Sequence, residues 1–370
     1  MQVDLTETNA SKIATALVKA RRAAGSPAMG MVLTLVVVTD EAGYSTSMRA
    51  AAEVSAEHPA RILGVIRKQR RGPIRLDASV RIGNNTSGEA VLMRMNGELV
   101  DHSESVVLPL LLPDSPVVVW WPQQAPADMA ADPLGGLSQR RISDSAGGKR
   151  NHHGSLLDQA THYAPGNTDL AWTRLTPWRG LLAAALDQHP VTVSSAEVRA
   201  ERNNASAELL SAWLQSRLKV EVVQKPSRGP GITQVRLLTR HGDIAISRPS
   251  GRSAVFSIPG EADRPVALKR RETAELMAEE LRRLDEDDIF AETVRVVVQR
   301  AGASAANSGR ATKRSAADTR PVAKKAAARQ PAAKKKATTR NPAAKRTAAK
   351  ERAVAESEAA GGASSAAGPA

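Results

Sequence analysis

Cysteine is absent from this 370-residue chain, and aromatic residues make up only 2% of it. Without cysteine the chain has no disulfide, thiolate zinc site, cysteine nucleophile or thiol redox switch of its own. The most apolar segment, 106–121, is interrupted by Pro109, Pro113, Asp114 and Pro116, so we expect no membrane helix there. The N-terminus lacks a basic start followed by a long apolar run, so we expect no secretory signal. These absences predict a cytoplasmic protein.

Positive charge is concentrated at the C-terminal end. The chain has a net charge of +14, and residues 301–370 hold 15 Lys/Arg and 4 Asp/Glu, a net of +11. The first 300 residues are therefore nearly neutral. After Gly302 there is no Leu, Ile, Met or aromatic residue, so this segment cannot offset its ordering entropy by burial. We predict a disordered basic tail over residues 303–370.

The tail contains a loose Lys/Ala/Pro repeat that begins at Pro321, Pro331 and Pro342. Such arrays resemble the basic tails of linker histones and some bacterial nucleoid proteins, which contact phosphate backbones without sequence choice. A solubilising tail without a nucleic-acid partner is an equal alternative. The candidate contacts to DNA or RNA are Lys324, Lys325, Lys334, Lys335, Lys336, Lys345 and Arg346.

The first 122 residues show alternating helix and strand patterns. Apolar periodicity and flanking turn residues predict helices over 8–24 and 46–57, buried strands over 29–38 and 61–67, a hairpin over 74–82 and 91–95, and a strand over 117–121 that ends the first sheet. We therefore expect an N-terminal α/β domain over residues 1–122. Residues 123–167, rich in Pro, Gly, Ala, Ser and Asp, form a loop-rich connector.

A second α/β domain is predicted over residues 168–302. Its patterns indicate a strand near 191–195, a helix over 205–218, an antiparallel meander of strands at 220–223, 235–239, 243–247 and 254–258, and a helix over 272–284. Residues 287–300 fit a helix or a strand. The expected fold class is α/β, with two domains that have mixed or antiparallel sheets flanked by helices, plus the basic tail.

The segment from Asp169 to Leu186 is the most informative stretch. Thr176 and Pro177 are typical of a helix start, as N-cap and first helical residue. Trp178, Leu181, Leu182, Ala185 and Leu186 then form one apolar stripe.

Arg179 lies in the first turn of this helix, where the helix dipole disfavours a cation. It either stacks on Trp172 or pairs with Asp169, or it joins Arg174, Trp172 and Trp178 in a surface for an acidic partner or a phosphate. The sequence leaves both alternatives open.

No catalytic or cofactor motif stands above its ordinary alternatives. The segments 145–149 and 229–234 fail the phosphate-loop and dinucleotide patterns. His152, His153 and His162 with Asp158 match no common metal spacing, and the acidic run 285–288 is ordinary before a helix. A basic pair such as Arg140 and Arg141 usually lies on a solvated surface. The alternative is that the pair binds a phosphorylated ligand. We expect no cofactor and no metal.

Six motifs in order resemble the OpcA family, the glucose-6-phosphate dehydrogenase assembly proteins of actinobacteria and cyanobacteria. They are Glu57-His-Pro-Ala-Arg61, Pro109-Leu-Leu-Leu-Pro-Asp114, Val117-Val-Val-Trp-Trp-Pro122, Arg140-Arg-Ile-Ser-Asp144, Asp169-Leu-Ala-Trp-Thr-Arg-Leu-Thr-Pro-Trp-Arg179 and Glu279-Glu-Leu-Arg-Arg-Leu284. The resemblance covers about residues 5–300. It implies a non-catalytic partner that binds the dehydrogenase, favours its active oligomer and raises its activity in the oxidative pentose phosphate pathway.

Our hypothesis for the contact surface adds Trp120 and Trp121 to Arg140, Arg141, Trp172, Arg174, Trp178 and Arg179. Trp120 and Trp121 would be anchors if exposed, and core residues otherwise. Two departures limit the resemblance: the thiol redox control associated with cyanobacterial activation cannot run through a chain without cysteine, and the tail lies outside the family pattern. Nucleic-acid binding through residues 310–352 is the alternative function, and a sugar-phosphate enzyme is a third. The oligomeric state stays undetermined.

Overall fold

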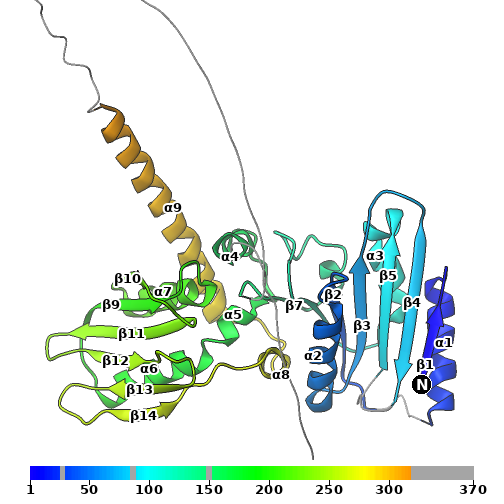
Figure 1. Ribbon diagram of the computed structural model, residues 1–370, viewed down its shortest axis with the longest axis horizontal. Helices are drawn as coiled ribbons and strands as arrows, with labels where there is room; N and C mark the ends of the chain where they lie inside the picture. The colour runs from blue at the N-terminus through cyan, green and yellow to red at the C-terminus, as the bar shows by residue number, and fades with distance from the viewer. Residues whose placement is uncertain (26–29, 84–88, 147–151, 318–370) are drawn as a thin grey trace, which may run out of the picture. The chain divides into compact units, whose positions relative to one another are not determined.

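Two mixed sheets flanked by helices form the described part of the protein (Figure 1). The computed structural model describes residues 1–25, 30–83, 89–146 and 152–317. Met1–Ala316 form one compact unit. The predicted α/β class is therefore confirmed. The seven candidate nucleic-acid contacts of the tail lie outside the described residues.

The first sheet has eight strands in the order β1-β4-β5-β3-β2-β6-β7-β8. The six from β5 to β8 are parallel, and the neighbours β4–β5 and β1–β4 are antiparallel. The core strand β2 is buried along its whole length because helices cover both faces. The elements are β1 (Gln2–Leu5), α1 (Ala10–Ala23), β2 (Leu33–Thr39), α2 (Tyr44–Glu57), β3 (Ala60–Arg67), β4 (Arg75–Ile82), β5 (Glu89–Asn96), α3 (Ser103–Val107), β6 (Val117–Trp121), β7 (Arg140–Ser143) and β8 (Asn167–Asp169).

The sequence predicts that this sheet ends at Trp121, but in the structure it continues. The strands β7 and β8 extend it, and α4 (His152–Thr161) lies between them in sequence. Both strands are short and mostly polar, yet every residue in them is buried. Their side chains are satisfied by hydrogen bonds rather than by apolar packing, so a search for hydrophobic periodicity does not find them.

The second sheet has six strands in the order β10-β9-β11-β12-β13-β14. The helix α7 connects β9 to β10 as a crossover, so β10 is parallel to β9 and is not the start of the predicted meander. The antiparallel meander is β11 to β14, and β14 was missed because three of its four residues are exposed. The strands are β9 (Val193–Ala200), β10 (Glu221–Pro226), β11 (Ile232–Thr239), β12 (Ile244–Ser247), β13 (Ser253–Ser257) and β14 (Arg264–Ala267).

The helices of this half are α5 (Leu170–Thr173), α6 (Thr176–Gln188), α7 (Ala205–Leu218), α8 (Thr273–Leu281) and α9 (Asp288–Ala317). The helix predicted over 205–218 is present with those ends, the one predicted over 272–284 is shorter at its C-terminal end, and the short helix α5 is not predicted by the sequence. Leu175 is the N-cap of α6, one residue before the predicted Thr176. The apolar stripe is confirmed, since Trp178, Leu182 and Ala185 are buried.

The helix α9 resolves the ambiguity at 287–300 and continues to Ala317, although the sequence predicts disorder from residue 303. Its packed residues Phe290, Val294 and Val297 start a helix that an alanine-rich sequence propagates at little cost. Within the described residues, none of the helices is both long and apolar enough to span a bilayer.

Candidate functional site

Residues 169–179 join the two sheets and contain four of the candidate contact residues. Asp169 ends β8 and caps α5 by accepting a hydrogen bond from Ala171 N at 2.7 Å. Arg174 and Leu175 then connect α5 directly to α6. This compact turn brings its side chains close in space to residues distant in the sequence. Trp172 reaches Asp287 before α9, Arg174 reaches Asp144 after β7, and Arg179 lies near Glu279 and Glu280 of α8.

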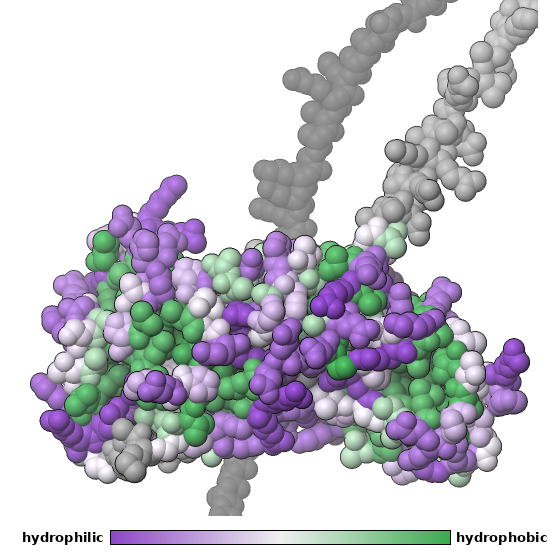
Figure 2. Space-filling view, turned by 180° about the vertical axis from the view of Figure 1, so that it is seen from behind, coloured by the Kyte–Doolittle hydropathy of each residue, from purple (hydrophilic) through white to green (hydrophobic). Residues whose placement is uncertain are grey.

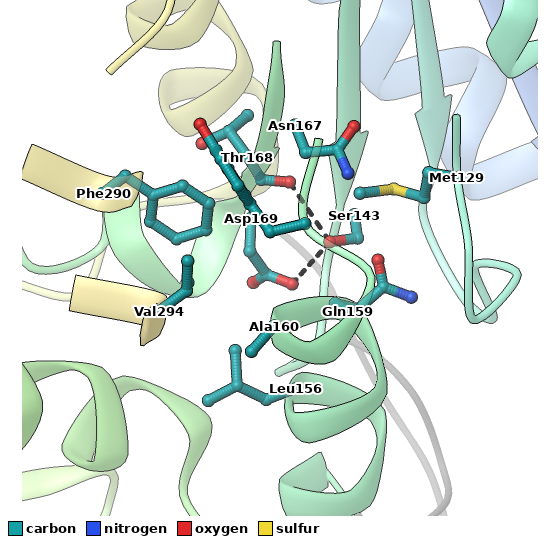
Figure 3. Close-up of a pocket in the computed structure, with 11 residues that line it drawn as sticks. Met129, Ser143, Leu156, Gln159, Ala160, Asn167, Thr168, Asp169, Phe290 and Val294 are labelled. Carbon is teal, nitrogen blue, oxygen red and sulfur yellow. Dashed lines mark hydrogen bonds between the residues drawn. The ribbon is translucent and has the colours of Figure 1, made fainter. Parts of the chain in front are cut away.

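Asp169 is a buried carboxylate held by several donors (Figure 3). It accepts hydrogen bonds from Ser143 Oγ and Ser145 Oγ, both at 2.6 Å, and from Ser145 N at 3.0 Å. Burial and the nearby Asp144 raise the pKa of Asp169, although its serine donors oppose the shift. Arg174 binds Asp144 through both terminal nitrogens, at 2.7 and 2.9 Å. The cluster fixes β7, β8 and α5 together.

A cavity next to Asp169 has a volume of about 10 Å³. Figure 3 shows Ser143, Asn167, Gln159 and Phe290 around it. Such a volume holds about one water molecule. The cavity is therefore far too small for a sugar phosphate or a nucleotide.

Arg179 stacks on Trp172, with its guanidinium carbon 3.6 Å from the ring centroid. This confirms the stacking alternative, and Asp169 is not its partner. Trp172 is itself buried and donates its indole N–H to Asp287 at 2.8 Å. Burial lowers the pKa of Arg179, while Asp287, Glu279 and Glu280 act in the opposite direction. Within the described part of the chain, the guanidinium of Arg179 has a single weak hydrogen bond, to Thr176 Oγ1 at 3.3 Å, and its buried Nε has no partner.

Arg140 and Arg141 are buried on β7 rather than solvated. Arg140 forms an ion pair with Glu280 on α8 at 2.7 Å, and Thr173 Oγ1 donates to the other oxygen of Glu280 at 2.6 Å. Arg141 donates to Asn167 at 2.5 Å and to the carbonyls of Ser138 and Pro165. Both guanidinium groups are already used in tying elements together, which leaves no free basic pair for a phosphorylated ligand.

The other candidate tryptophans are core residues. Trp120 and Trp121 on β6 are each 1% exposed and pack into the cores on opposite faces of the first sheet. Trp178 lies in the core of the second sheet, where Arg248 stacks on its ring at 4.9 Å. The structure therefore selects the core alternative for Trp120 and Trp121, and none of the three offers a surface to a partner.

Side-chain hydrogen bonds connect the residues that follow β2 and β6 at the carboxyl edge of the first sheet. In doubly wound sheets, ligands bind at the carboxyl ends of the strands where the strand order reverses, here between β2 and β6. Thr39 donates to Gln123 at 2.9 Å, and Gln123 donates to Ser47 at 3.0 Å. Asp40 accepts a hydrogen bond from Gly43 N at 2.6 Å at the start of α2, where helix N–H groups are free to bind an anion. Sequence reasoning missed this feature because it depends on strand order.

The histidine metal hypothesis finds no support in the described residues. The side chains of His152 and His153 lie outside them, and His162 Nδ1 is 3.0 Å from the carbonyl oxygen of Asp158. In the described ranges, no three His, Cys, Asp or Glu side chains converge to hold a metal ion.

Comparison with known proteins adds a family to this geometry. Residues 51–160 match the glucose-6-phosphate dehydrogenase subunit N-terminal domain of the OpcA family, and residues 165–294 match its C-terminal domain. The chain is also 27% identical over 161 residues to an OxPP cycle protein OpcA from Synechocystis, an alignment that covers 40% of this chain and 32% of that protein. The chain thus spans about a third of the length of that curated relative.

Some solved structures show a weak likeness to this chain. A mutant 3-ketoreductase from Actinomadura kijaniata aligns with 72% of this chain and 94% of its own, at 9% identity and a TM-score of 0.41. An oxidoreductase from Sinorhizobium meliloti aligns with 75% and 89%, at 10% identity and a TM-score of 0.37. The two family matches together cover more than half of the sequence, and they fall in the order that the six motifs predict. The chain therefore belongs to the OpcA family of glucose-6-phosphate dehydrogenase subunits.

Proposed function

We propose that this protein is a non-catalytic partner of glucose-6-phosphate dehydrogenase that binds the enzyme and favours its active oligomer. The family match is the observation that carries the proposal. Two features of the structure support it. Gln123 is hydrogen-bonded to Thr39 and Ser47 at the carboxyl ends of β2 and β6, and the cavity beside Asp169 has room for about one water molecule.

The physical mechanism is linkage. A partner that binds the active assembly more tightly than the inactive one shifts the balance between them by the ratio of its two affinities. No chemistry on the substrate is required of the partner. The name of the Synechocystis relative, an OxPP cycle protein, supports placing this activity in the oxidative pentose phosphate pathway.

Arg179 is the best remaining contact among the eight candidates. It is partly exposed, it is held flat on Trp172, and it has donors to spare. A pre-positioned guanidinium recognises carboxylates well because little side-chain entropy is lost on binding. Trp172 contributes as the buried platform. Figure 2 shows hydrophilic residues gathered across the middle of one face of the molecule.

The test is a titration of the full chain into the glucose-6-phosphate dehydrogenase of the same organism. Enzyme activity and molar mass by light scattering are followed in the same samples. We expect both to rise together and to saturate. A rise in activity at constant dehydrogenase assembly would contradict the assembly mechanism, and no change in either quantity would contradict the partnership.

The contact residue is tested in the same assay with Arg179→Ala. We expect the concentration needed for half-maximal activation to rise about fivefold to tenfold, since a central contact contributes more than about 1 kcal/mol. Arg22→Ala, at an exposed arginine on α1, is the matched control and should activate like the wild type. Equal activation by both variants would remove Arg179 from the interface.

Nucleic-acid binding by the tail is the second candidate function. The observation that favours it is the segregation of charge, with +11 of the chain's +14 in residues 301–370. A solubilising role would need no such concentration of one sign in a repeated pattern. This function would act beside the dehydrogenase partnership rather than replace it.

A further inference from the structure

The second sheet has one strongly basic end. The loops at this end follow β9, β10, β12 and β14, because β10 is parallel to β9 and the other neighbouring strands are antiparallel. They hold seven Lys/Arg and two Asp/Glu, a net of +5, in residues 201–204, 227–231, 248–252 and 268–272. The opposite end holds two Lys/Arg and three Asp/Glu in residues 189–192, 219–220, 240–243 and 258–263. We call the surface formed by the first four loops the basic end.

Backbone contacts hold the four loops of the basic end side by side. Glu201 N donates to the carbonyl oxygen of Gly231 at 3.0 Å, and Arg270 N donates to that of Gly251 at 3.3 Å. A Cβ atom at Gly251 would lie 2.8 Å from Cγ of Pro230, so the second and third loops are in close contact. The charged residues of the basic end therefore share one surface.

The basic end presents four exposed arginines: Arg202, Arg228, Arg252 and Arg270. In the described part of the chain, none of the four is paired with a carboxylate. Two other cations of these loops, Lys269 and Arg271, are each paired with a glutamate of α8. The four unpaired arginines leave a positive field at the basic end that an acidic partner can neutralise.

Arg248 is the buried member of the basic end. It is 6% exposed, and it donates to the carbonyl oxygens of Ile232 at 3.2 Å and Leu268 at 3.0 Å. Burial, and then the charge of Arg270, lower the pKa of Arg248 to about 10. Among the described residues, no carboxylate forms an ion pair with Arg248 to offset this repulsion. A negative surface brought to the basic end would therefore favour the charged form of Arg248 as well.

The basic end is continuous with Arg179, the proposed contact residue. Arg271 is bonded to Glu279, which also accepts from Thr176 Oγ1 at 2.7 Å. Arg179 in turn donates to Thr176 Oγ1 at 3.3 Å. Arg271 directly follows Arg270 in the chain, so one partner surface can contact Arg179 and the basic end together.

The extent and composition of the basic end favour a folded protein partner. Six strands about 4.8 Å apart give it a width of about 24 Å, which exceeds what a small anion needs. Six of its seven cations are arginines, the residue that is enriched in protein interfaces where lysine is depleted. Its loops contain no aromatic residue to stack on the bases of a single-stranded nucleic acid.

We propose that the basic end binds an acidic surface of the dehydrogenase and that its exposed arginines speed the association of the two proteins. This inference rests on the proposed partnership, for which it names a docking surface and the charge of the partner. Opposite charges steer two proteins toward a productive encounter, and salt screens their attraction. Arg179 then forms a close contact beside this surface.

The test is the association rate of the full chain with the dehydrogenase, measured by biolayer interferometry at low and at high salt. The wild type should associate faster at low salt. The variant Arg228→Glu/Arg252→Glu/Arg270→Glu should associate about tenfold more slowly than the wild type at low salt, because steering is reversed. It should also no longer associate faster at low salt than at high salt.

The matched control reverses three exposed arginines outside the basic end, as Arg22→Glu/Arg49→Glu/Arg240→Glu. Its net charge equals that of the first variant, so a difference between the two reports the location of the charge. The control should associate much as the wild type does. Circular dichroism melts establish that both variants are folded.

The outcomes separate this inference from the proposed function. A wild type that binds the dehydrogenase, with a basic-end variant that associates like the control, would overturn the basic end and leave the partnership intact. A wild type that does not bind the dehydrogenase would overturn both. A basic-end variant that binds the dehydrogenase normally but loses affinity for duplex DNA would assign the basic end to nucleic acid and overturn the protein partner.

Discussion

At the scale of single residues, buried charges decide how the two sheets are joined. Arg140 on β7 is paired with Glu280 on α8, and both side chains are almost fully buried. Glu280 also accepts from Thr173, and Arg140 donates to the carbonyl of Asp285 at 2.9 Å. Burying the charges of Arg140 and Glu280 has a large desolvation cost, and each of these hydrogen bonds offsets part of it. The pair therefore specifies where α8 docks, more than it adds net stability.

Arg140→Met should lower the free energy of unfolding by about 3–5 kcal/mol, because it leaves Glu280 buried without a counter-charge. Urea unfolding followed by tryptophan fluorescence measures this. The matched control is Arg282→Met, which breaks the exposed pair between Arg282 at the end of α8 and Glu57 of α2. Exposed pairs contribute little. Similar losses in the two variants would show that Arg140 does not act through burial.

At the scale of elements, three aromatic rings connect three helices. Tyr163, which follows α4, contacts Phe290 of α9 edge to face at a centroid distance of 6.0 Å, and Phe290 contacts Trp172 of α5 at 5.7 Å. The Tyr163 hydroxyl donates to Glu286 at 3.2 Å. Burial, and then the charge of Glu286, raise the pKa of Tyr163 to about 12. The row of rings holds the start of α9 against the cavity wall.

This shift predicts a pH dependence of stability. The unfolded state loses the Tyr163 proton near its ordinary pKa of 10.0, whereas the folded state keeps it until about 12. The stability that this proton supplies is complete below pH 10 and is lost as pH rises to about 12. Urea midpoints of the wild type should therefore approach those of Tyr163→Phe over that range. A difference that stays constant from pH 8 to pH 11.5 would contradict the raised pKa.

At the scale of the whole molecule, charge and fold are separated along the chain. Residues 1–300 carry a net +3, and residues 301–370 carry the rest. Taken as a whole, the nearly neutral sheets and helices have no net charge that favours an acidic or a basic partner. The tail, in contrast, has enough cations to neutralise several phosphates. The two proposed functions, the dehydrogenase partnership and nucleic-acid binding, can therefore be measured separately on two parts of one chain.

Deleting residues 318–370 should abolish binding to double-stranded DNA while activation of the dehydrogenase is kept. For the full chain, the logarithm of DNA affinity should fall steeply and linearly with the logarithm of salt concentration, since each neutralised phosphate releases a counterion. Fluorescence anisotropy of a labelled duplex measures both. Weak, salt-insensitive binding by the full chain would instead support a solubilising tail.

The sequence predicted more of the fold than of the site. Strong patterns, such as the helix that contains Trp178 and the buried strand predicted over 29–38 and found over 33–39, are visible because burial leaves a recognisable apolar pattern in the sequence. Patterns of polar residues gave wrong results. Arg140 and Arg141 resemble a solvated pair, but hydrogen bonds to Glu280 and Asn167 allow them to be buried. Such bonds join residues far apart in the chain, so no local pattern contains them.

By itself the sequence determined the fold class, the absence of thiol chemistry, the segregation of charge and the family, because composition, periodicity and word order are properties of the chain alone. Only the tertiary structure decided which candidate residues can meet a partner. Trp120, Trp121 and Trp178 are buried, Arg140 and Arg174 are paired with carboxylates, and Arg179 is stacked with donors to spare. Exposure and pairing are set by elements that meet across long sequence separations, as β7 and α8 do.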